Sequence, residues 1–235
     1  MNYLYEIKEI SKVYGHGSGA TQALRSINLT IESGKLTAIL GPSGSGKSTL
    51  LNILGALDKP SSGQVLFLGE DISHYSNKNL AKFRRENIGF VFQSYNLLPN
   101  LTALENVEFS TEIRELPREN AYEALKLLGL EARIKHYPTE LSGGEQQRVS
   151  IARAIAKKPK AVLCDEPTGA LDNKTGVMAL KILKDLNRNL GTSIILITHS
   201  KEISKMADTV VKILNGEVVD KYDVANPLDP EDIEW

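Results

Sequence analysis

One short segment, GPSGSGKST at 41–49, constrains the fold of this chain more than any other. It follows the apolar run 36–40 and precedes the helix-forming run 49–54, which is the context that the pattern G-x-x-x-x-G-K-[ST] requires. Its glycines let the backbone curl until several N–H groups converge on phosphate oxygens, and the next helix N-terminus adds a favourable dipole. The segment therefore predicts an α/β fold with a phosphate-binding loop.

The same loop assigns roles to individual side chains. Lys47 is placed to reach the β- and γ-phosphates of a nucleotide, and the Ser48 hydroxyl is placed to bind Mg²⁺. A glycine-rich turn that only joins a strand to a helix would not need the complete pattern in this context. The predicted nucleotide-binding residues of the loop are Gly41, Ser43, Gly44, Ser45, Gly46, Lys47, Ser48 and Thr49.

Length and charge limit what the rest of the chain can be. Its 235 residues fit one domain with a substantial core, and 28 Lys+Arg against 29 Asp+Glu argue against a surface-wide nucleic-acid interface. A single cysteine, Cys164, excludes an internal disulfide framework and fits a reducing compartment. No segment has the form of a signal peptide or of the ~20 apolar residues that cross a bilayer, so we expect any membrane link to come through a partner.

Strand-like and helix-like segments alternate along the chain, which predicts one compact α/β unit. Segments 4–13 and 26–31 alternate polar and apolar residues on either side of a glycine-rich connection, so we expect them to pair as antiparallel strands. Nearly continuous apolar runs at 161–164 and 193–198, linked by a helix near 177–190, predict parallel strands covered on both faces.

Two acidic residues, Asp165 and Glu166, follow directly after the first of these apolar runs. In an open parallel sheet, ligands bind at the edge formed by the carboxyl ends of the strands. We expect Asp165 to be an outer ligand of the Mg²⁺ held by Ser48, and Glu166 to orient or deprotonate the attacking water. Adjacent carboxylates at a strand end are also common as solvated turn residues, and it is the phosphate loop that favours the catalytic interpretation.

His199 follows the other apolar run and allows two interpretations. A histidine at this point could cap the turn into the next helix. Because it stands at the end of a parallel strand, it could also donate a hydrogen bond to a developing phosphoryl charge.

Six motifs occur in a fixed order: GPSGSGKST, Gln93, LSGGEQQR at 141–148, AVLCDEP at 161–167, GALD at 169–172 and His199. In this combination the chain resembles the nucleotide-binding subunit of ATP-binding-cassette (ABC) transporters, from about Tyr3 to Val219. The resemblance implies a P-loop NTPase (RecA-like) core with a parallel central sheet, an N-terminal antiparallel β subdomain and an inserted helical subdomain. It implies one ABC ATPase domain at 1–219, with the helical subdomain at about 94–158.

The resemblance also implies roles that position alone leaves open. Tyr14 would stack on adenine, although a tyrosine at a strand end is also an ordinary core residue. Gln93 would contact Mg²⁺ or the attacking water and sense the permease. Asp172 would cross a dimer interface. The remaining contacts, to the γ-phosphate of ATP held by an opposite subunit, would come from Ser142, Gly143 and Gly144, with Glu145 beside them.

Physical reasoning supports this role for the LSGGEQQR segment. Its serine and glycines precede the helix-like run 146–157, so they can present N–H groups, a hydroxyl and a helix dipole to an anion. Since the chain already has one phosphate cradle, a second is useful only on another molecule's phosphates. The resemblance implies a head-to-tail dimer, of identical chains or paralogues, with two ATP molecules at the interface. Lys47, Mg²⁺, Ser142 and His199 would meet the phosphates, and Glu166 the water.

Within the family, segments 52–60, 83–93 and 96–107 are similar to the lipoprotein-release and macrolide-export branch. The partners of that branch are permeases with few membrane spans and a large extracytoplasmic domain, which extrude lipoproteins, peptides or antibiotics, or transmit force. The chain is therefore expected in the cytoplasm, on the inner face of the cell membrane. Segment 108–117, where a permease would dock, is shorter and more polar than the branch pattern.

Three other functions share part of this pattern. A small-molecule kinase shares the phosphate loop but does not need LSGGEQQR. A soluble cassette ATPase of DNA repair or translation would need a coiled-coil insertion, zinc-type cysteines or a second cassette. The third alternative, a subunit that drives an extracytoplasmic enzyme through its permease without moving a solute, is compatible with the sequence.

The C-terminal segment 220–235 is acidic and contains Pro227 and Pro230, which oppose helix formation. Such a composition predicts a disordered tail, with a docking segment as the alternative.

Overall fold

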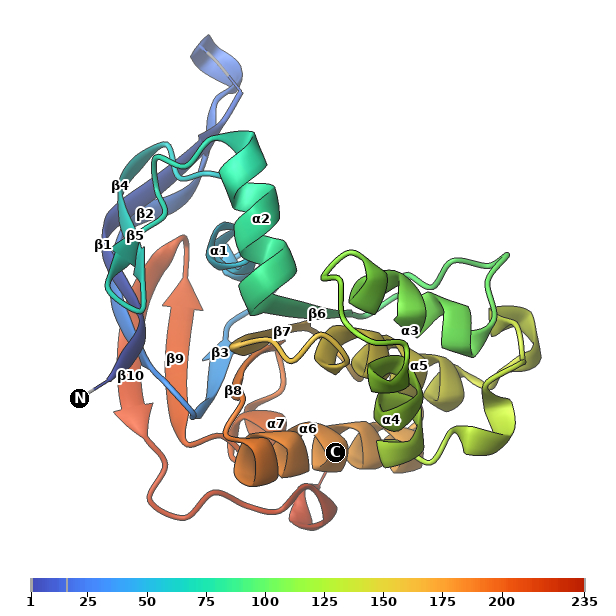
Figure 1. Cartoon of the computed structure of the whole chain (residues 1–235). Coiled ribbons are helices and arrows are strands. Elements are labelled where there is room, and N and C mark those ends of the chain that lie inside the picture. Colours follow the sequence, from blue (N-terminus) through green and yellow to red (C-terminus); the bar gives the residue numbers. More distant parts are fainter. Residues whose placement is uncertain (1, 16, 235) are drawn as a thin grey trace.

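The computed structural model describes residues 2–15 and 17–234, which form two sheets and a group of helices (Figure 1). The strands are β1 (Tyr3–Tyr14), β2 (Thr21–Glu32), β3 (Leu36–Leu40), β4 (Ser62–Phe67), β5 (Glu70–Asp71), β6 (Ile88–Phe92), β7 (Ala161–Asp165), β8 (Ser193–Thr198), β9 (Thr209–Leu214) and β10 (Glu217–Asp223). The α-helices are α1 (Lys47–Leu54), α2 (Asn77–Asn87), α3 (Ala103–Glu112), α4 (Glu119–Leu127), α5 (Gly143–Ile155), α6 (Asn173–Leu190) and α7 (Lys201–Ser204).

The larger sheet positions the chemistry. Its strand order is β10-β9-β3-β8-β7-β6, and the pairs from β9 to β6 are all parallel, while β10 joins the edge antiparallel. Strands β3 and β8 are buried along their whole length, as the continuous apolar runs predict for a sheet covered on both faces. Because β3, β6, β7 and β8 run in the same direction, their carboxyl ends meet at one edge.

The smaller sheet is antiparallel, with the order β2-β1-β4-β5, and it confirms the expected pairing of the first two strands. Helices α1 and α2 lie between it and the larger sheet (Figure 1). Tyr5, Phe67 and Phe83 pack edge to face in this layer, with ring centroids 5.1 and 4.9 Å apart. The shared core fixes α1, and with it the phosphate loop, against both sheets.

Helices α3, α4 and α5 form a separate lobe on the other side of the larger sheet (Figure 1). The buried Asn106 of α3 holds the connection from β6 in place: its amide accepts from the Leu98 N–H at 2.8 Å and donates to the carbonyls of Leu98, Leu101 and Thr102. Among the described helices, none combines the length and the hydrophobicity that a membrane span needs.

The prediction of a disordered C-terminal tail is wrong for its described residues, while Trp235 lies outside the described part of the chain. Strand β10 continues across the expected boundary at 219, and the segment after it packs along α6, where Ile233 is buried. Two acidic residues of the tail pair with cations of α6: Glu231 with Lys181, and Asp229 with Lys184 and Arg188. Composition alone could not reveal this pairing, because its partners lie far away in sequence.

Candidate functional site

The phosphate loop joins β3 to α1 and depends on glycine at several positions. Gly44 and Gly46 have φ of 76° and 102°, a left-handed backbone region that favours glycine. A Cβ on Gly46 would lie 2.7 Å from the Ala23 carbonyl of β2, and one on Gly41 would lie 2.2 Å from the Ile213 carbonyl of β9. The loop therefore adopts this conformation only because its glycines lack side chains, which lets β2 and β9 approach it closely.

Two polar groups of this loop are arranged to receive an anion. The buried Lys47 donates from Nζ to the carbonyls of Gly41 at 2.9 Å and Pro42 at 2.8 Å, which holds its ammonium group at the loop. The Ser45 hydroxyl is buried and has no hydrogen-bond partner among the described residues. A buried polar group without a partner is costly, and a phosphate oxygen would satisfy it.

A cavity of about 470 Å³ opens over the loop. Sequence reasoning missed much of its lining, because this lining comes from β2 and from the turn between β9 and β10, which contain no recognisable motif. The turn is attached to the site by two hydrogen bonds: the Arg25 N–H donates to the Gly216 carbonyl at 2.8 Å, and the Gly216 N–H donates to the Ser45 carbonyl at 2.9 Å. The lining residues are Thr21, Gln22, Ala23, Arg25, Gly44, Gly46, Lys47, Ser48, Thr49, Asn215 and Gly216.

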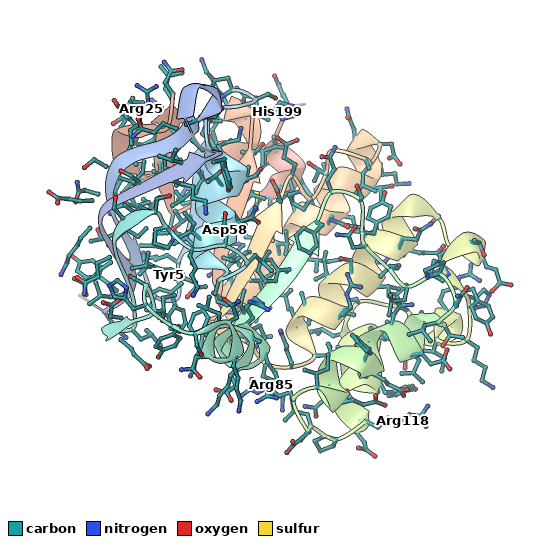
Figure 2. All side chains as sticks on the ribbon, turned by 90° about the horizontal axis from the view of Figure 1, so that it is seen from above. Tyr5, Arg25, Asp58, Arg85, Arg118 and His199 are labelled. Atoms are coloured by element: carbon teal, nitrogen blue, oxygen red, sulfur yellow. The ribbon has the colours of Figure 1, made fainter. Side chains whose placement is uncertain are left out.

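Tyr14, at the end of β1, lies beside this cavity rather than in the core, and 42% of it is exposed. Its hydroxyl donates to Asp58 at 2.8 Å, and the Lys12 ammonium lies 4.8 Å from the ring centroid. Partial burial and the Asp58 contact raise the pKa of the Tyr14 hydroxyl, while a hydrogen bond with Thr49 of the phosphate loop lowers it. Asp58, which is labelled in Figure 2, was not anticipated from the sequence.

The carboxyl ends of β7 and β8 bring the predicted catalytic residues together. The Ser48 hydroxyl lies 3.4 Å from an Asp165 oxygen, and His199 Nδ1 lies 3.2 Å from Glu166 Oε1. Burial raises the pKa of Asp165, and the charge of Glu166 adds to this, whereas Ser48 and Lys47 lower it. Glu166 has φ of 46°, a strained conformation for a side chain of this size and one that is often found at functional sites.

Gln93 stands one residue beyond β6, whose Phe92 pairs with Asp165 in the sheet. A Cβ on Gly169 would lie 2.7 Å from Gln93 Nε2, so the glutamine side chain rests directly on this glycine. The Gly169 N–H in turn donates to the Glu166 carbonyl at 3.0 Å. Gln93 therefore lies next to the turn that carries Glu166.

The LSGGEQQR segment forms the start of α5. The helix begins at Gly143, earlier than the expected run 146–157, and Ser142 is its N-cap in a capping box with Glu145. The Ser142 N–H and hydroxyl both donate to Glu145 Oε2, at 2.9 and 2.8 Å, and Arg133 Nε donates to Oε1 at 2.7 Å. These contacts, first that of the Ser142 N–H and then that of Arg133, lower the pKa of Glu145 to about 2.

The N-terminus of α6 packs against this segment. Asp172 caps α6 by accepting from the Thr175 N–H at 3.0 Å and from its hydroxyl at 2.8 Å. A Cβ on Gly144 would lie 2.1 Å from the Thr175 methyl carbon, so the two helix ends touch at the glycine. Neither Thr175 nor Arg133 was identified from the sequence.

The predicted site residues thus fall into two groups. Ser48, Asp165, Glu166 and His199 meet at the sheet edge beside the phosphate loop, and Ser48 also lines the cavity. The Ser142–Glu145 and Asp172 helix ends form another cluster, outside that lining. Figure 2 shows Arg25 and His199 at the same margin of the molecule, with the helical lobe extending away from them.

The sheet edge fits a nucleotide with Mg²⁺. The described residues contain no cluster of three or more His, Cys, Asp or Glu suited to a metal. Ser48 and Asp165 offer two oxygens to a hard cation, and Mg²⁺ commonly takes its other ligands from phosphates and water.

Comparisons with known proteins agree with this geometry. A model of the ABC transporter family matches residues 24–169. The uncharacterized ABC transporter ATP-binding protein MJ1508 of Methanocaldococcus jannaschii is 48% identical over 92% of this chain and 98% of that protein. The macrolide export ATP-binding/permease protein MacB of Pasteurella multocida is 49% identical over 92% of this chain. The chain spans only 34% of that MacB protein.

Solved structures resemble the whole chain. The dimeric, post-hydrolysis structure of the ATP-binding cassette MJ0796 bound to ADP and Pi has a TM-score of 0.87 and 41% identity, over 94% of this chain and 99% of that chain. The structure of cbiO1 from Clostridium perfringens, described as part of the ABC transporter complex cbiONQ, has a TM-score of 0.84 and 34% identity, over 98% of this chain and 90% of that chain.

Proposed function

Because this chain belongs to the ABC transporter family and is an ATPase subunit, we propose that two copies, or a copy and a paralogue, bind two ATP molecules between them, head to tail. The observation that carries the proposal is the separation of two anion-binding clusters within one chain. The phosphate loop and the Ser142 cradle do not share a cavity, so each needs a second subunit to complete an ATP site. ATP binding would close the dimer, and hydrolysis would open it.

Within each composite site, the residues of this chain have distinct tasks. Lys47 and the loop N–H groups hold the phosphates, and Tyr14 supports the base. Glu166 accepts a proton from the attacking water, and His199, 3.2 Å from it, donates to the γ-phosphate. Ser48, Asp165 and Gln93 would hold Mg²⁺, which neutralises charge on the phosphates when bound. Ser142, Gly143, Gly144 and Asp172 serve the neighbour's ATP.

We infer that a permease docks beside α3, in a groove of about 320 Å³ between the helical lobe and β6. Stacked Phe90 and Phe92 line it together with Phe109 and Ile113, which are 49% and 46% exposed. Positively charged side chains also line the groove. Burial, together with the charges of nearby arginines, lowers the pKa of one of them, Lys157, to about 8. The groove would therefore accept a segment with apolar and acidic side chains.

The partner would be a permease with few membrane spans and a large extracytoplasmic domain, which places this chain on the cytoplasmic face of the membrane. The name of the MacB relatives, macrolide export ATP-binding/permease protein, supports export of peptides, lipoproteins or antibiotic-like molecules. Driving an extracytoplasmic enzyme without moving a solute is the alternative. Purifying the complex in mild detergent, then measuring transport in liposomes against activation of a cell-wall hydrolase, separates the two.

The Glu166→Gln variant tests the composite site. The amide keeps the shape of the side chain but cannot accept the proton, so we expect ATP binding to persist, turnover to fall by about 100-fold or more, and an ATP-dependent dimer to accumulate. Steady-state phosphate release and light scattering measure these effects. Glu202→Gln, at an exposed ion pair with Lys205, is the matched control and should keep turnover. Near-parental hydrolysis by Glu166→Gln would overturn the role of Glu166.

A further inference from the structure

We propose that Arg133 is a positioning residue of the second phosphate cradle, which neutralises Glu145 and so lets the Ser142 hydroxyl turn to the γ-phosphate of the opposite subunit's ATP. The inference rests on the proposed head-to-tail dimer. It concerns a residue outside the LSGGEQQR segment, at the end of the 3-10 helix Glu131–Arg133 that follows α4.

The first observation is that the Ser142 hydroxyl is already engaged. A serine hydroxyl has one proton to donate, and here it is directed at Glu145 Oε2 at 2.8 Å. The same hydroxyl oxygen accepts from the Glu145 N–H at 3.3 Å. Before the Ser142 hydroxyl can donate to a phosphate oxygen, its hydrogen bond to Glu145 must break. The Glu145 carboxylate must then remain stable with one hydrogen-bond donor fewer.

The second observation is the charge of the cradle. Glu145 is ionised at neutral pH, and its contacts, which lower its pKa to about 2, favour this charged form, so a negative charge lies beside the place where another anion is to bind. Two neighbouring negative charges repel each other unless a nearby cation compensates one of them. Glu145 is mostly covered, with a side-chain exposure of 17%, so water screens it only in part.

Arg133 is placed to supply that compensation. Its Nε donates to Oε1 at 2.7 Å, while the cradle uses Oε2, so the two oxygens of Glu145 are divided between the cation and the serine. When the hydroxyl turns away, Oε2 keeps the Ser142 N–H, and the Arg133 contact is unaffected. The ion pair thus permits the rotation without leaving an uncompensated charge at the dimer face.

The experiment uses the full chain carrying Glu166→Gln, and the readout is the ATP concentration at which half of the protein is dimeric by light scattering. Adding Arg133→Ala leaves Glu145 unpaired and should raise this concentration about tenfold or more. Adding Glu145→Gln as well removes the repelling charge. The ATP concentration for half-dimerisation should then return to within about threefold of its value for the Glu166→Gln parent. A purely structural role for Arg133 predicts no such rescue, because the ion pair is absent in both variants.

A matched control and a single substitution complete the test. Arg118→Ala removes an arginine of the same lobe that also pairs with a largely covered glutamate, Glu108, and Figure 2 places Arg118 toward the opposite margin from His199. It should leave dimerisation unchanged. Glu145→Gln alone should lower the required ATP concentration, because Arg133 then adds an unpaired positive charge; this result is decisive even if Arg133→Ala does not fold.

Each outcome has a defined meaning. If the Glu166→Gln parent does not dimerise with ATP, the proposed function fails and the inference with it. If the parent dimerises but Arg133→Ala has no effect, or Glu145→Gln gives no rescue, only the inference is overturned. Binding of a fluorescent ATP analogue to the monomer should be the same in all variants, because their phosphate loops are identical.

Discussion

We propose that Lys47 and Tyr14 hold the two ends of the nucleotide, and contacts within the protein already fix both side chains. Lys47 is anchored by two loop carbonyls, and Tyr14 by Asp58, which also pairs with Lys12 at 2.6 Å. Such pre-organisation reduces the conformational entropy that a side chain loses on binding. Tyr14 is therefore supported by neighbours that carry no motif of their own, whereas the two carbonyls that anchor Lys47 belong to the loop motif itself.

Substitution of Tyr14 tests the base-binding role at this scale. Tyr14→Ala removes the ring, and since base–aromatic stacking contributes about 1–3 kcal/mol, the Kd for ATP should rise about fivefold or more. Tyr14→Phe keeps the ring and loses only the bond to Asp58, so its Kd should rise less than about threefold. Titration with a fluorescent ATP analogue measures both. Equal effects of the two substitutions would contradict stacking.

Between elements, the contact of α5 with α6 links the two helix ends that we propose as the second phosphate cradle. Ser142 caps α5 and Asp172 caps α6, and the helix ends meet where Gly144 touches Thr175. The two caps are thereby kept in a fixed relation to each other. A residue of α6 thus shapes the LSGGEQQR segment although it lies outside every motif.

Gly144→Ala should separate these helix ends, because the new Cβ would lie 2.1 Å from the Thr175 methyl carbon. We expect ATPase turnover to fall at least tenfold while monomer affinity for ATP is retained. Adding Thr175→Ser removes the methyl group but keeps the hydroxyl bond to Asp172, and should recover most of the lost turnover. Phosphate release measures both variants. Failure of this rescue would show that the loss has another cause than the clash.

For the molecule as a whole, the C-terminal segment fastens α6 to the larger sheet. Ile233 and Pro230 are buried, and the buried Lys184 of α6 donates to the Pro227 and Leu228 carbonyls of that segment. The Leu228 N–H in turn donates to the Lys205 carbonyl beyond α7. The segment thus connects the helix that carries Asp172 with the region after His199.

Deletion of residues 226–235 should therefore destabilise the fold. Loss of the buried Ile233 side chain, together with the Lys184 charge left without its partners, should lower the free energy of unfolding by about 2–4 kcal/mol. Adding Lys184→Met to the deletion should recover part of this loss, because it removes the unpaired charge. Urea denaturation followed by circular dichroism measures both. An unchanged midpoint in the deletion variant would contradict the fastening role.

The sequence by itself determined what local patterns encode. The strand, loop and helix around 41–49 require only neighbouring residues, and the continuous apolar runs specify a covered parallel sheet. Since parallel strands end at one edge, Asp165, Glu166 and His199 were predicted beside Ser48, and the structure places them there. The motifs that carry the family resemblance are likewise short segments of consecutive residues.

Only the tertiary structure decided which residues, distant in sequence, support the motif residues. Asp58 behind Tyr14, Thr175 against Gly144 and Arg133 on Glu145 have no pattern of their own, because their roles come from contacts between separate elements. The acidic tail shows the same limit: its composition predicts disorder, yet it is ordered by cations and an apolar surface on α6. Complementary charge and shape depend on three-dimensional proximity, which composition and spacing do not contain.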